Sequence, residues 1–260
     1  MIKHRVEMLP VSVKPSEVTL IREAELELKL EADKDRFVYS TDFVASKGRD
    51  NIIMKDRDLD TPLLFLKMKN KEKLHIRCKL AVENKTASQV CLATTFFHVD
   101  PVLAEEDKKK FVEQGGDPRV FDNFYIQRSY SKDDIGRPNW IDLQIESIGV
   151  LPAKECLKMA VSILRDQLNK YMEEATNAIT REKEKNVYHV VLDMGGHTLL
   201  ALLQEVIYHS QMVDFVSYDV PHPLKSKTIL RFLTENTPES VLARARKDIQ
   251  DYCEIVEKVL

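Results

Sequence analysis

Hydrophobic and polar residues alternate along several short segments in the first part of the chain. From Ala24 to Glu31 the leucines fall on one side and the charged residues on the other, and the same period of two runs from Leu74 to Val82. This alternation is typical of half-buried antiparallel strands. Shorter strands are predicted at 37–39, 63–68, 92–99 and 141–145, so the region 24–99 is expected to be antiparallel β structure with little helix.

The segment between residues 102 and 138 interrupts this pattern. It contains Gly115-Gly116-Asp117-Pro118 and Ile135-Gly136-Arg137-Pro138, and turn signals of this density predict a long surface loop. The Lys108–Lys110 run follows three acidic residues, which favours a solvated loop over a contact with DNA.

After Pro152 the apolar period changes from two to between three and four. This change predicts one amphipathic helix of about 30 residues, at 154–180. The charged stretch 181–185 is expected to end it as a solvated linker. The apolar seam of this helix comprises Val161, Leu164, Leu168, Tyr171, Ala175 and Ala178.

The last part of the chain predicts the order strand, helix, strand, strand, helix. The first helix opens at His197-Thr198-Leu199, and the last begins at Thr237-Pro238 with the Thr237 hydroxyl as its N-cap. One short sheet cannot cover two helices, so we expect the helix at 154–180 to pack on this segment. The apolar positions are Leu199, Leu202, Leu203, Val206 and Ile207 in the first helix, and Val241, Ala245, Ile249, Tyr252, Val256 and Val259 in the last.

Composition excludes several classes of protein. The formal net charge is −3, which argues against coating of nucleic acid by bulk charge. No apolar run is long enough to span a bilayer, and no signal peptide is expected. The 4 cysteines form no CxxC pair, so buried, reduced thiols are expected in place of a zinc ribbon. No phosphate-binding loop, nucleophile–base pair or ligand cluster appears, so no catalytic residue, metal or cofactor is predicted.

The order of these elements, together with several short motifs, resembles the dimerisation subunits of multisubunit RNA polymerases. One set of motifs is similar to the small subunit of the eukaryotic eleventh or archaeal L type: His197-Thr198-Leu199, Gln204, Phe215–Tyr218 and His222-Pro223. Another is similar to the larger subunit of the third or archaeal D type, related to bacterial alpha: His4-Arg5 with Met8–Pro10, Val38–Asp42, Leu74–Cys78, and Glu146–Gly149 with Leu151-Pro152.

The resemblance implies an α+β fold in which two alpha-type dimerisation modules are fused in one chain around an inserted, mostly antiparallel β domain. Residues 1–23 would start the larger-subunit-like module, truncated relative to the family. Residues 24–139 would form the inserted domain, with a long loop at 100–139. Residues 140–185 would hold the return strand and the long dimerisation helix, and residues 186–260 the small-subunit-like module. The fusion is similar to polymerase subunits of large cytoplasmic DNA viruses, which implies the virion and the viral factory as location, or otherwise the nucleus.

By the same resemblance, the chain would be a noncatalytic assembly platform of a DNA-directed RNA polymerase. Its intramolecular pseudo-dimer would nucleate binding of the second-largest, catalytic subunit. The largest subunit and a small zinc-binding subunit of the tenth type would also bind, and DNA would be reached only through the complex. The resemblance also allows a separate chain that completes the N-terminal module. The implied dimerisation seam comprises Val161, Leu164, Leu168, Tyr171, Ala175, Leu199, Leu202, Leu203, Val206, Ile249, Tyr252 and Val256. The implied partner contacts are His4, Arg5, His197, Thr198 and His222.

Other interpretations stay open at this point. The chain could be a stand-alone α+β enzyme or ligand-binding protein, or a free transcription-factor adaptor, and each apolar stripe could be ordinary core. His197 could cap its helix or act as a general base, and His4 with Arg5 could lie in a frayed terminus. The sequence also departs from the family: Leu200-Ala201 replace a Gly-Asn pair, and the cysteine-rich, metal-binding loop has no counterpart between Met8 and Leu26.

Overall fold

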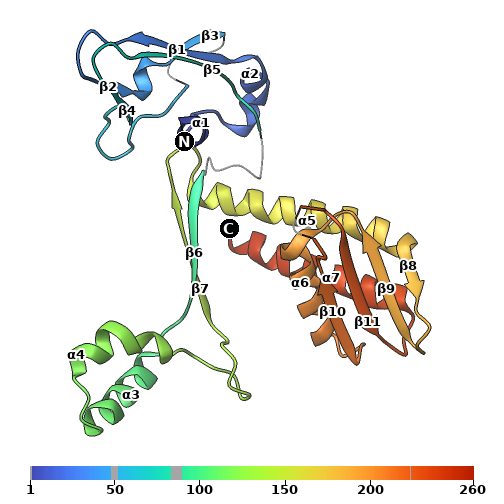
Figure 1. Cartoon of the computed structure of the whole chain (residues 1–260). Helices are drawn as coiled ribbons and strands as arrows, with labels where there is room; N and C mark the ends of the chain where they lie inside the picture. The colour runs from blue at the N-terminus through green and yellow to red at the C-terminus, as the bar shows by residue number, and fades with distance from the viewer. Residues whose placement is uncertain (1, 48–51, 83–89, 223) are drawn as a thin grey trace. The chain divides into compact units, whose positions relative to one another are not determined.

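The chain forms two compact units, Met1–Ala153 and Lys154–Leu260 (Figure 1). The computed structural model describes residues 2–47, 52–82, 90–222 and 224–260, and for residues 18, 20, 21 and 46 it describes the backbone alone. Pro223 of the predicted His-Pro motif therefore lies outside the described residues. The boundary between the units falls within the predicted segment 140–185, between its strand and its helix. The four segments expected from the resemblance stay predictions.

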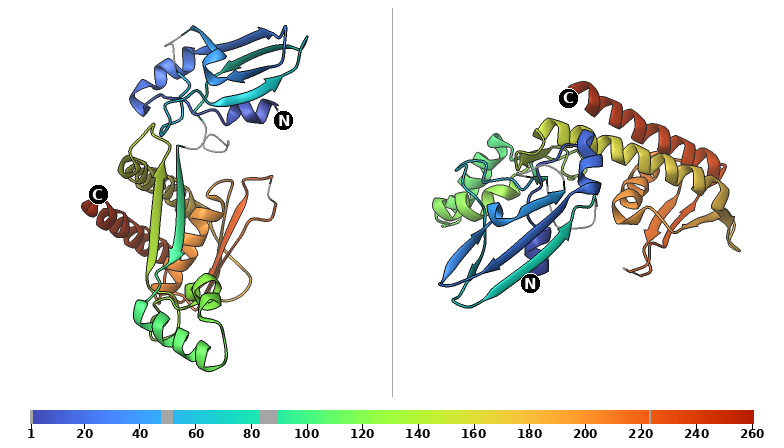
Figure 2. Two further views of the ribbon diagram at one scale, coloured as in Figure 1. Left: turned by 90° about the vertical axis from the view of Figure 1, so that its left-hand side faces the viewer. Right: turned by 90° about the horizontal axis from the view of Figure 1, so that it is seen from above.

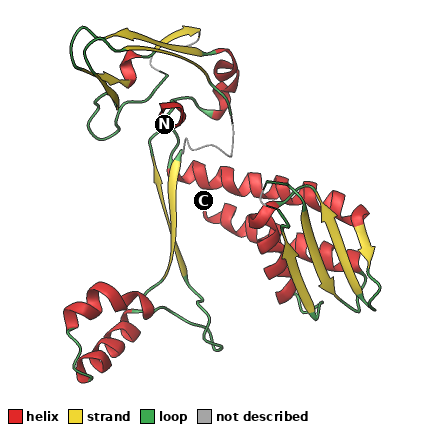
Figure 3. Cartoon of the chain, in the orientation of Figure 1, coloured by secondary structure: helices red, strands yellow, loops and turns green. Residues whose placement is uncertain are grey.

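The described residues of the first unit form three antiparallel sheets (Figure 3). In the largest, β1 lies between β3 and β5, and two further pairs are formed by β2 with β4 and by β6 with β7. The predicted strands are confirmed, with β3 as an addition. The bounds are β1 Glu25–Glu31, β2 Arg36–Tyr39, β3 Val44–Lys47, β4 Leu64–Met68, β5 Lys73–Lys79, β6 Cys91–Phe97 and β7 Ile141–Ser147, preceded by the short helices α1 Ile2–Glu7 and α2 Val18–Glu23.

The alternation along β1 places its two kinds of side chain as predicted. Leu26 and Leu28 are buried in a core that also contains Val38, Ile52 and Phe65. On the opposite face the charged residues of β1 pair across to β5, with Lys73 Nζ 2.7 Å from Glu31 and Lys79 Nζ 3.4 Å from Glu25. One face of the sheet therefore packs and the other is solvated, as a period of two requires.

The predicted long loop at 102–138 is wrong for its first two thirds. Residues Pro101–Glu113 form helix α3, and Pro118–Val120 (α4) begins a run of short π and 3-10 turns that ends at Arg128. Asp100 caps α3 by accepting hydrogen bonds from the amides of Val102 and Leu103, and Pro101 occupies the first helical position. The glycines and prolines thus separate short helices.

The Lys108–Lys110 run consequently lies on helix α3. Lys108 Nζ is 2.6 Å from a carboxylate oxygen of Asp122, and Lys109 pairs with Glu105 one helical turn away. The apolar side of α3 contributes Phe111, whose ring contacts the rings of Phe121 and Tyr125. These three aromatic rings give the segment a small core of its own.

The second unit is a four-stranded antiparallel sheet, in the order β10-β11-β9-β8, packed with three helices (Figures 1 and 2). The predicted order of strands and helices is confirmed. The bounds are α5 Ala153–Ala178, β8 Ile179–Arg181, β9 Val187–Leu192, α6 Gly196–His209, β10 Phe215–Asp219, β11 Thr228–Leu233 and α7 Pro238–Val259. Among the described residues, no helix has the length and apolar character needed to cross a membrane.

Two local predictions in this unit need correction. The stretch 181–185 is more than a linker, because Arg181 ends strand β8 and Glu182 binds Arg231 of β11. Thr237 precedes α7, but its hydroxyl makes no capping hydrogen bond. Its carbonyl oxygen instead accepts from the amides of Ser240 and Val241 and from Ser240 Oγ (2.7 Å), which together close the first turn.

The turn between β9 and α6 depends on a pair of glycines. Gly195 has φ +103° and ψ −55°, a conformation that L-residues rarely adopt, and a Cβ there would lie 3.2 Å from the ring of Tyr171. Gly196 also has a positive φ, +65°, but a Cβ there would meet nothing within 4 Å. Gly195 is thus needed both for its backbone conformation and for the close approach of Tyr171, whereas Gly196 is needed for its backbone conformation alone.

We expect Gly195→Ala to destabilise the second unit by about 2–4 kcal/mol, because backbone strain and overpacking against a fully buried ring add up. Gly196→Ala, the matched control, should cost only about 1 kcal/mol. Urea unfolding followed by circular dichroism measures both. Equal losses for the two variants would contradict the close approach of Tyr171 to the turn.

Candidate functional site

The candidate site is the pair of long helices α5 and α7, which lie side by side (Figures 1 and 2). They run antiparallel: Arg165 of α5 pairs with Glu257, whereas Asn169, one turn later, binds Arg246 and Gln250, earlier in α7. Both helices contribute to one apolar core together with α6 and the sheet.

Most residues of the predicted seam lie in this core. The buried ones are Val161, Leu168, Tyr171, Ala175, Leu199, Leu203, Val206 and Ile249, and the partly buried Leu164 and Leu202 pack against them. Facing residues of the sheet, such as Val190, Leu230 and Phe232, complete the core. Helix α5 therefore covers apolar surface of the 186–260 segment, as expected from the period of three and four.

Two predicted seam residues lie outside the core. Tyr252 is 58% exposed and Val256 is 37% exposed, whereas Cys253 is buried. The spacing from Ile249 allows either a step of three or a step of four, and the series Ala245, Ile249, Cys253 continues by fours. Which step points inward depends on how the helix is rotated against α5, and spacing alone does not determine that rotation.

A polar cluster fixes the contact between the two helices. The side-chain oxygen of Asn169 accepts hydrogen bonds from Arg246 Nε (3.1 Å), Arg246 Nη2 (2.8 Å) and Gln250 Nε2 (3.1 Å). Toward the C-terminus of α7, Arg165 Nη2 lies 2.7 Å from Glu257 Oε2. These contacts favour one register of α5 against α7, because a shift by one turn would leave the partly buried Arg246 without its acceptor.

The last two turns of α7 expose an apolar stripe that is not covered by the core. This α7 stripe consists of Tyr252, Ile255, Val256 and Val259, which are 58%, 58%, 37% and 82% exposed. Their spacing of i, i+3, i+4 and i+7 is that of the packing face of an amphipathic helix. Contiguous exposed apolar residues of this kind are typical of protein interaction surfaces.

The predicted partner contacts are divided between the two units. In the first unit, Arg5 Nη1 donates to the carbonyl oxygen of Phe65 (2.8 Å) and so attaches α1 to β4, while His4 lies exposed near Glu7. In the second unit, His197 and Thr198 are exposed at the start of α6.

His197 neither caps its helix nor meets a catalytic partner among the described contacts. The N-cap position belongs to Gly195, and the His197 ring lies edge-to-face against Tyr218 of β10, with centroids 5.8 Å apart. Further along α6, Gln204 Oε1 accepts a hydrogen bond from the Tyr218 amide (3.2 Å). Both side chains of α6 thus secure the outer strand of the sheet.

The corner after β10 presents another exposed apolar side chain. His222 Nδ1 accepts from the Leu224 amide (3.1 Å), and the His222 carbonyl accepts from the Lys225 amide (3.1 Å), which closes the turn. The Leu224 side chain is 90% exposed at its tip. The sequence prediction selected His222 here, but Leu224 is the residue with unburied apolar surface.

Sequence analysis missed an ion-pair cluster on the sheet. Arg231 binds Glu182 through two hydrogen bonds of 2.8 and 2.6 Å, and His189 Nδ1 lies 3.4 Å from the same carboxylate. The hydrogen bonds from Arg231 lower the pKa of Glu182, and the nearby His189 acts in the same direction. Within the described part of the chain, no three His, Cys, Asp or Glu side chains are grouped so as to hold a metal ion.

Comparison with known proteins finds relatives of the segment that contains α7, one of the two helices of this site. The family model of the RNA polymerase Rpb3/Rpb11 dimerisation domain matches residues 188–259, from β9 to the end of α7. Subunit Rpo11 of the DNA-directed RNA polymerase of Korarchaeum cryptofilum is 35% identical over 74 residues, which cover 28% of this chain and 76% of that protein. Subunit Rpo11 of Saccharolobus solfataricus is 32% identical over 71 residues, 26% of this chain and 77% of that protein. Subunit RPAC2 of RNA polymerases I and III of Saccharomyces cerevisiae is 36% identical over 63 residues, 24% of this chain and 44% of that protein.

The Glu182 cluster generates a prediction about acid stability. Because the pKa of Glu182 is lowered below its usual 4.5, its ion pair stabilises the fold fully above that value and is lost as the pH falls through the lowered pKa. Glu182→Gln should therefore lower the melting temperature at pH ~7 and flatten its decline toward pH ~3. Thermal unfolding at a series of pH values tests this. Glu254→Gln, an exposed site in α7, is the control and should change neither.

Proposed function

The chain belongs to the RNA polymerase Rpb3/Rpb11 dimerisation-domain family, and we propose that it is a noncatalytic assembly platform of a DNA-directed RNA polymerase. Its relatives support the role of a polymerase subunit. The matched segment accounts for about a quarter of this chain, 28% in the case of the first relative. The functions given to the remaining residues are therefore part of the proposal.

One observation carries the proposal of an intramolecular pseudo-dimer. Helix α5 lies outside the matched residues 188–259, yet its Leu168, Tyr171 and Ala175 are completely buried in the core of that dimerisation domain. This burial supports the proposal that a helix of the same chain covers the apolar surface that such a domain would offer to a partner. We propose that α5 takes the place of the larger partner subunit's dimerisation helix.

Fusion of the two partners has a clear physical advantage. A tethered helix is present at an effective concentration on the order of millimolar, so its docking does not depend on the concentration of a second subunit. The pseudo-dimer would form during folding and then offer a finished surface to larger subunits. On the resemblance described above, we also propose that the chain is of the fused type found in large cytoplasmic DNA viruses.

The α7 stripe and the Leu224 corner are the surfaces that we propose for partner subunits. Both expose apolar side chains that are not part of the core, and a contiguous stripe such as that of α7 is typical of interaction surfaces. By the resemblance, the pseudo-dimer would bind the second-largest, catalytic subunit. The small zinc-binding subunit of the tenth type and the largest subunit would also bind. A helix from a separate chain would also fit the i, i+3, i+4, i+7 spacing of the stripe.

Native purification distinguishes the polymerase subunit from the two alternatives, a stand-alone enzyme and a free adaptor. A polymerase subunit elutes in a large complex with the other subunits, whereas a stand-alone enzyme or free adaptor elutes at the mass of this chain, 30.1 kDa. Elution only as the lone chain would contradict the assembly role. A specific observation in favour of the enzyme would be a built cleft with convergent polar groups, and the candidate site is instead a packed helix pair.

We expect the double variant Ile255→Asp/Val259→Asp to lose most of the copurifying polymerase subunits. Because both side chains are more than half exposed, the free energy of unfolding should change by no more than about 0.5 kcal/mol. Affinity purification of the tagged chain from its native source, followed by mass spectrometry, measures the loss. Ala243→Asp introduces the same charge at an exposed position on the other side of α7 and should retain all partners.

Leu224→Ser tests the corner separately. Its side chain is 90% exposed, so thermal unfolding should be unchanged, while removal of an apolar anchor should weaken partner binding by roughly tenfold. The amount of each subunit that copurifies with the variant is the measurement. Lys225→Ser, in the same turn, is the control. Equal retention of partners by both variants would remove Leu224 from the proposed interface.

A further inference from the structure

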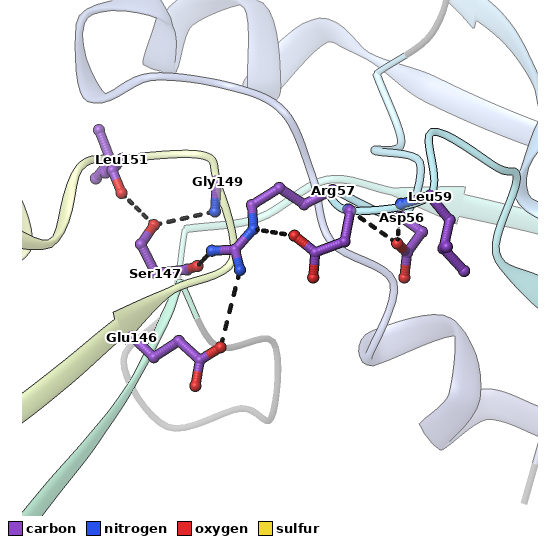
Figure 4. A network of polar contacts seen from close by, with 8 residues as sticks. Asp56, Arg57, Leu59, Glu146, Ser147, Gly149 and Leu151 are labelled. Carbon is purple, nitrogen blue, oxygen red and sulfur yellow. Dashed lines mark hydrogen bonds and ion pairs between the residues drawn. The ribbon is translucent and has the colours of Figure 1, made fainter.

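A polar network in the first unit connects two segments that are far apart in the sequence (Figure 4). Arg57 lies in the loop before β4, and its Nη1 donates a hydrogen bond of 2.6 Å to the carbonyl oxygen of Ser147, at the end of β7. Ser147 begins the corner 147–151, after which Ala153 starts helix α5. The proposed function does not explain why an arginine reaches this corner.

The loop that carries Arg57 is held together by hydrogen bonds of Asp56. Asp56 Oδ1 accepts from the amides of Asp58 (3.0 Å) and Leu59 (2.8 Å), and the Asp56 amide donates to the carbonyl of Thr61 (2.8 Å). Such side-chain caps hold a turn in one conformation. Arg57 Nε in turn donates to Asp58 Oδ1 (3.1 Å), which orients the guanidinium.

The loop is also attached to the core of the first unit. Ile52, which precedes it, is buried, and the Met54 amide donates to the carbonyl of Pro10 (2.9 Å). Val11 and Ile53 form an isolated antiparallel bridge. The base of the loop is therefore held at a defined position on the β-rich core, so that Arg57 presents its guanidinium from a fixed support.

The corner itself is closed by Ser147 and fits closely under Arg57. Ser147 Oγ accepts from the Gly149 amide (3.0 Å) and donates to the Leu151 carbonyl. Gly149 has φ +101°, and a Cβ there would lie 3.3 Å from Met54 Cε and 3.4 Å from Arg57 Cδ. The aliphatic part of Arg57 thus covers the glycine, while its guanidinium binds the carbonyl two residues earlier.

We propose that Arg57 is a positioning residue that holds the corner 147–151, the last corner of the first unit, in one conformation. The essential contact is the charge-assisted hydrogen bond to the Ser147 carbonyl, supported by packing on Gly149. The ion pair with Glu146 is a minor part of it, because the two groups are 3.9 Å apart and Glu146 is 62% exposed.

Hydrogen–deuterium exchange on the full chain tests this proposal. Arg57→Gln should increase exchange of the amides in 148–153 by roughly tenfold, which corresponds to about 1.4 kcal/mol of lost local stability. Arg57→Lys keeps the charge but not the planar fork, and should give an intermediate increase. The unfolding transition of the first unit should stay unchanged in both Arg57 variants, since this side chain is about half exposed.

Glu146→Gln is the matched control, because it removes only the long ion pair and should leave exchange at the corner unaltered. Two results would overturn the proposal. Unchanged exchange in Arg57→Gln would mean that the corner is closed by Ser147 alone. Faster exchange throughout the first unit, in proportion to a lower unfolding midpoint, would mean that Arg57 is a general stabilising residue with no specific effect on the corner.

Discussion

The second unit depends on one interaction, the burial of helix α5 against α6, α7 and the sheet. A four-stranded sheet can cover only part of the apolar surface of two amphipathic helices, and the remainder must be removed from water by something else. Leu168, Tyr171 and Ala175 of α5 supply that cover and are themselves fully buried. Without α5 the second unit would expose a large apolar face of α6, α7 and the sheet.

Apolar burial has little directional preference, so the register of the two long helices needs polar contacts. Asn169 accepts three hydrogen bonds from α7, and Arg165 pairs with Glu257 near its end. Two residues after Asn169, the Gly195 turn allows the ring of Tyr171 to approach the backbone closely. Polar contacts and close packing in the middle of α5 therefore determine how it is placed, whereas the α7 stripe takes no part in these contacts. Helix α7 thus packs on α5 with one group of residues and leaves the α7 stripe exposed.

The first unit differs from the second in that short strands form its core, and hydrogen bonds of a loop hold its last corner before α5. Its core is formed by the alternating faces of short strands, with charged pairs on the solvated side of β1 and β5. Asp56, Asp58 and Arg57 then form a small structured loop whose guanidinium meets the main chain of the last corner. Main-chain carbonyls at such corners have no strand partner, so a side-chain donor is an effective way to hold them.

The sequence by itself determined the periodicities, and with them nearly all strands, the long helix at 153–178, the order of elements after residue 187 and most of the seam. These follow from local chemistry, since alternation by two or by three and four has few physical interpretations. It did not determine helix α3, because the glycines and prolines around it fit a loop as well as a series of capped short helices.

Only the tertiary structure decided which of two nearly equivalent positions points inward, Cys253 over Tyr252, since this depends on the rotation of α7 against α5. It also decided the pairing of Glu182 with Arg231 and of Arg57 with Ser147, which are 49 and 90 residues apart in the chain. Contacts of this range leave no periodic signal in a single sequence, because they arise from folding of the whole unit.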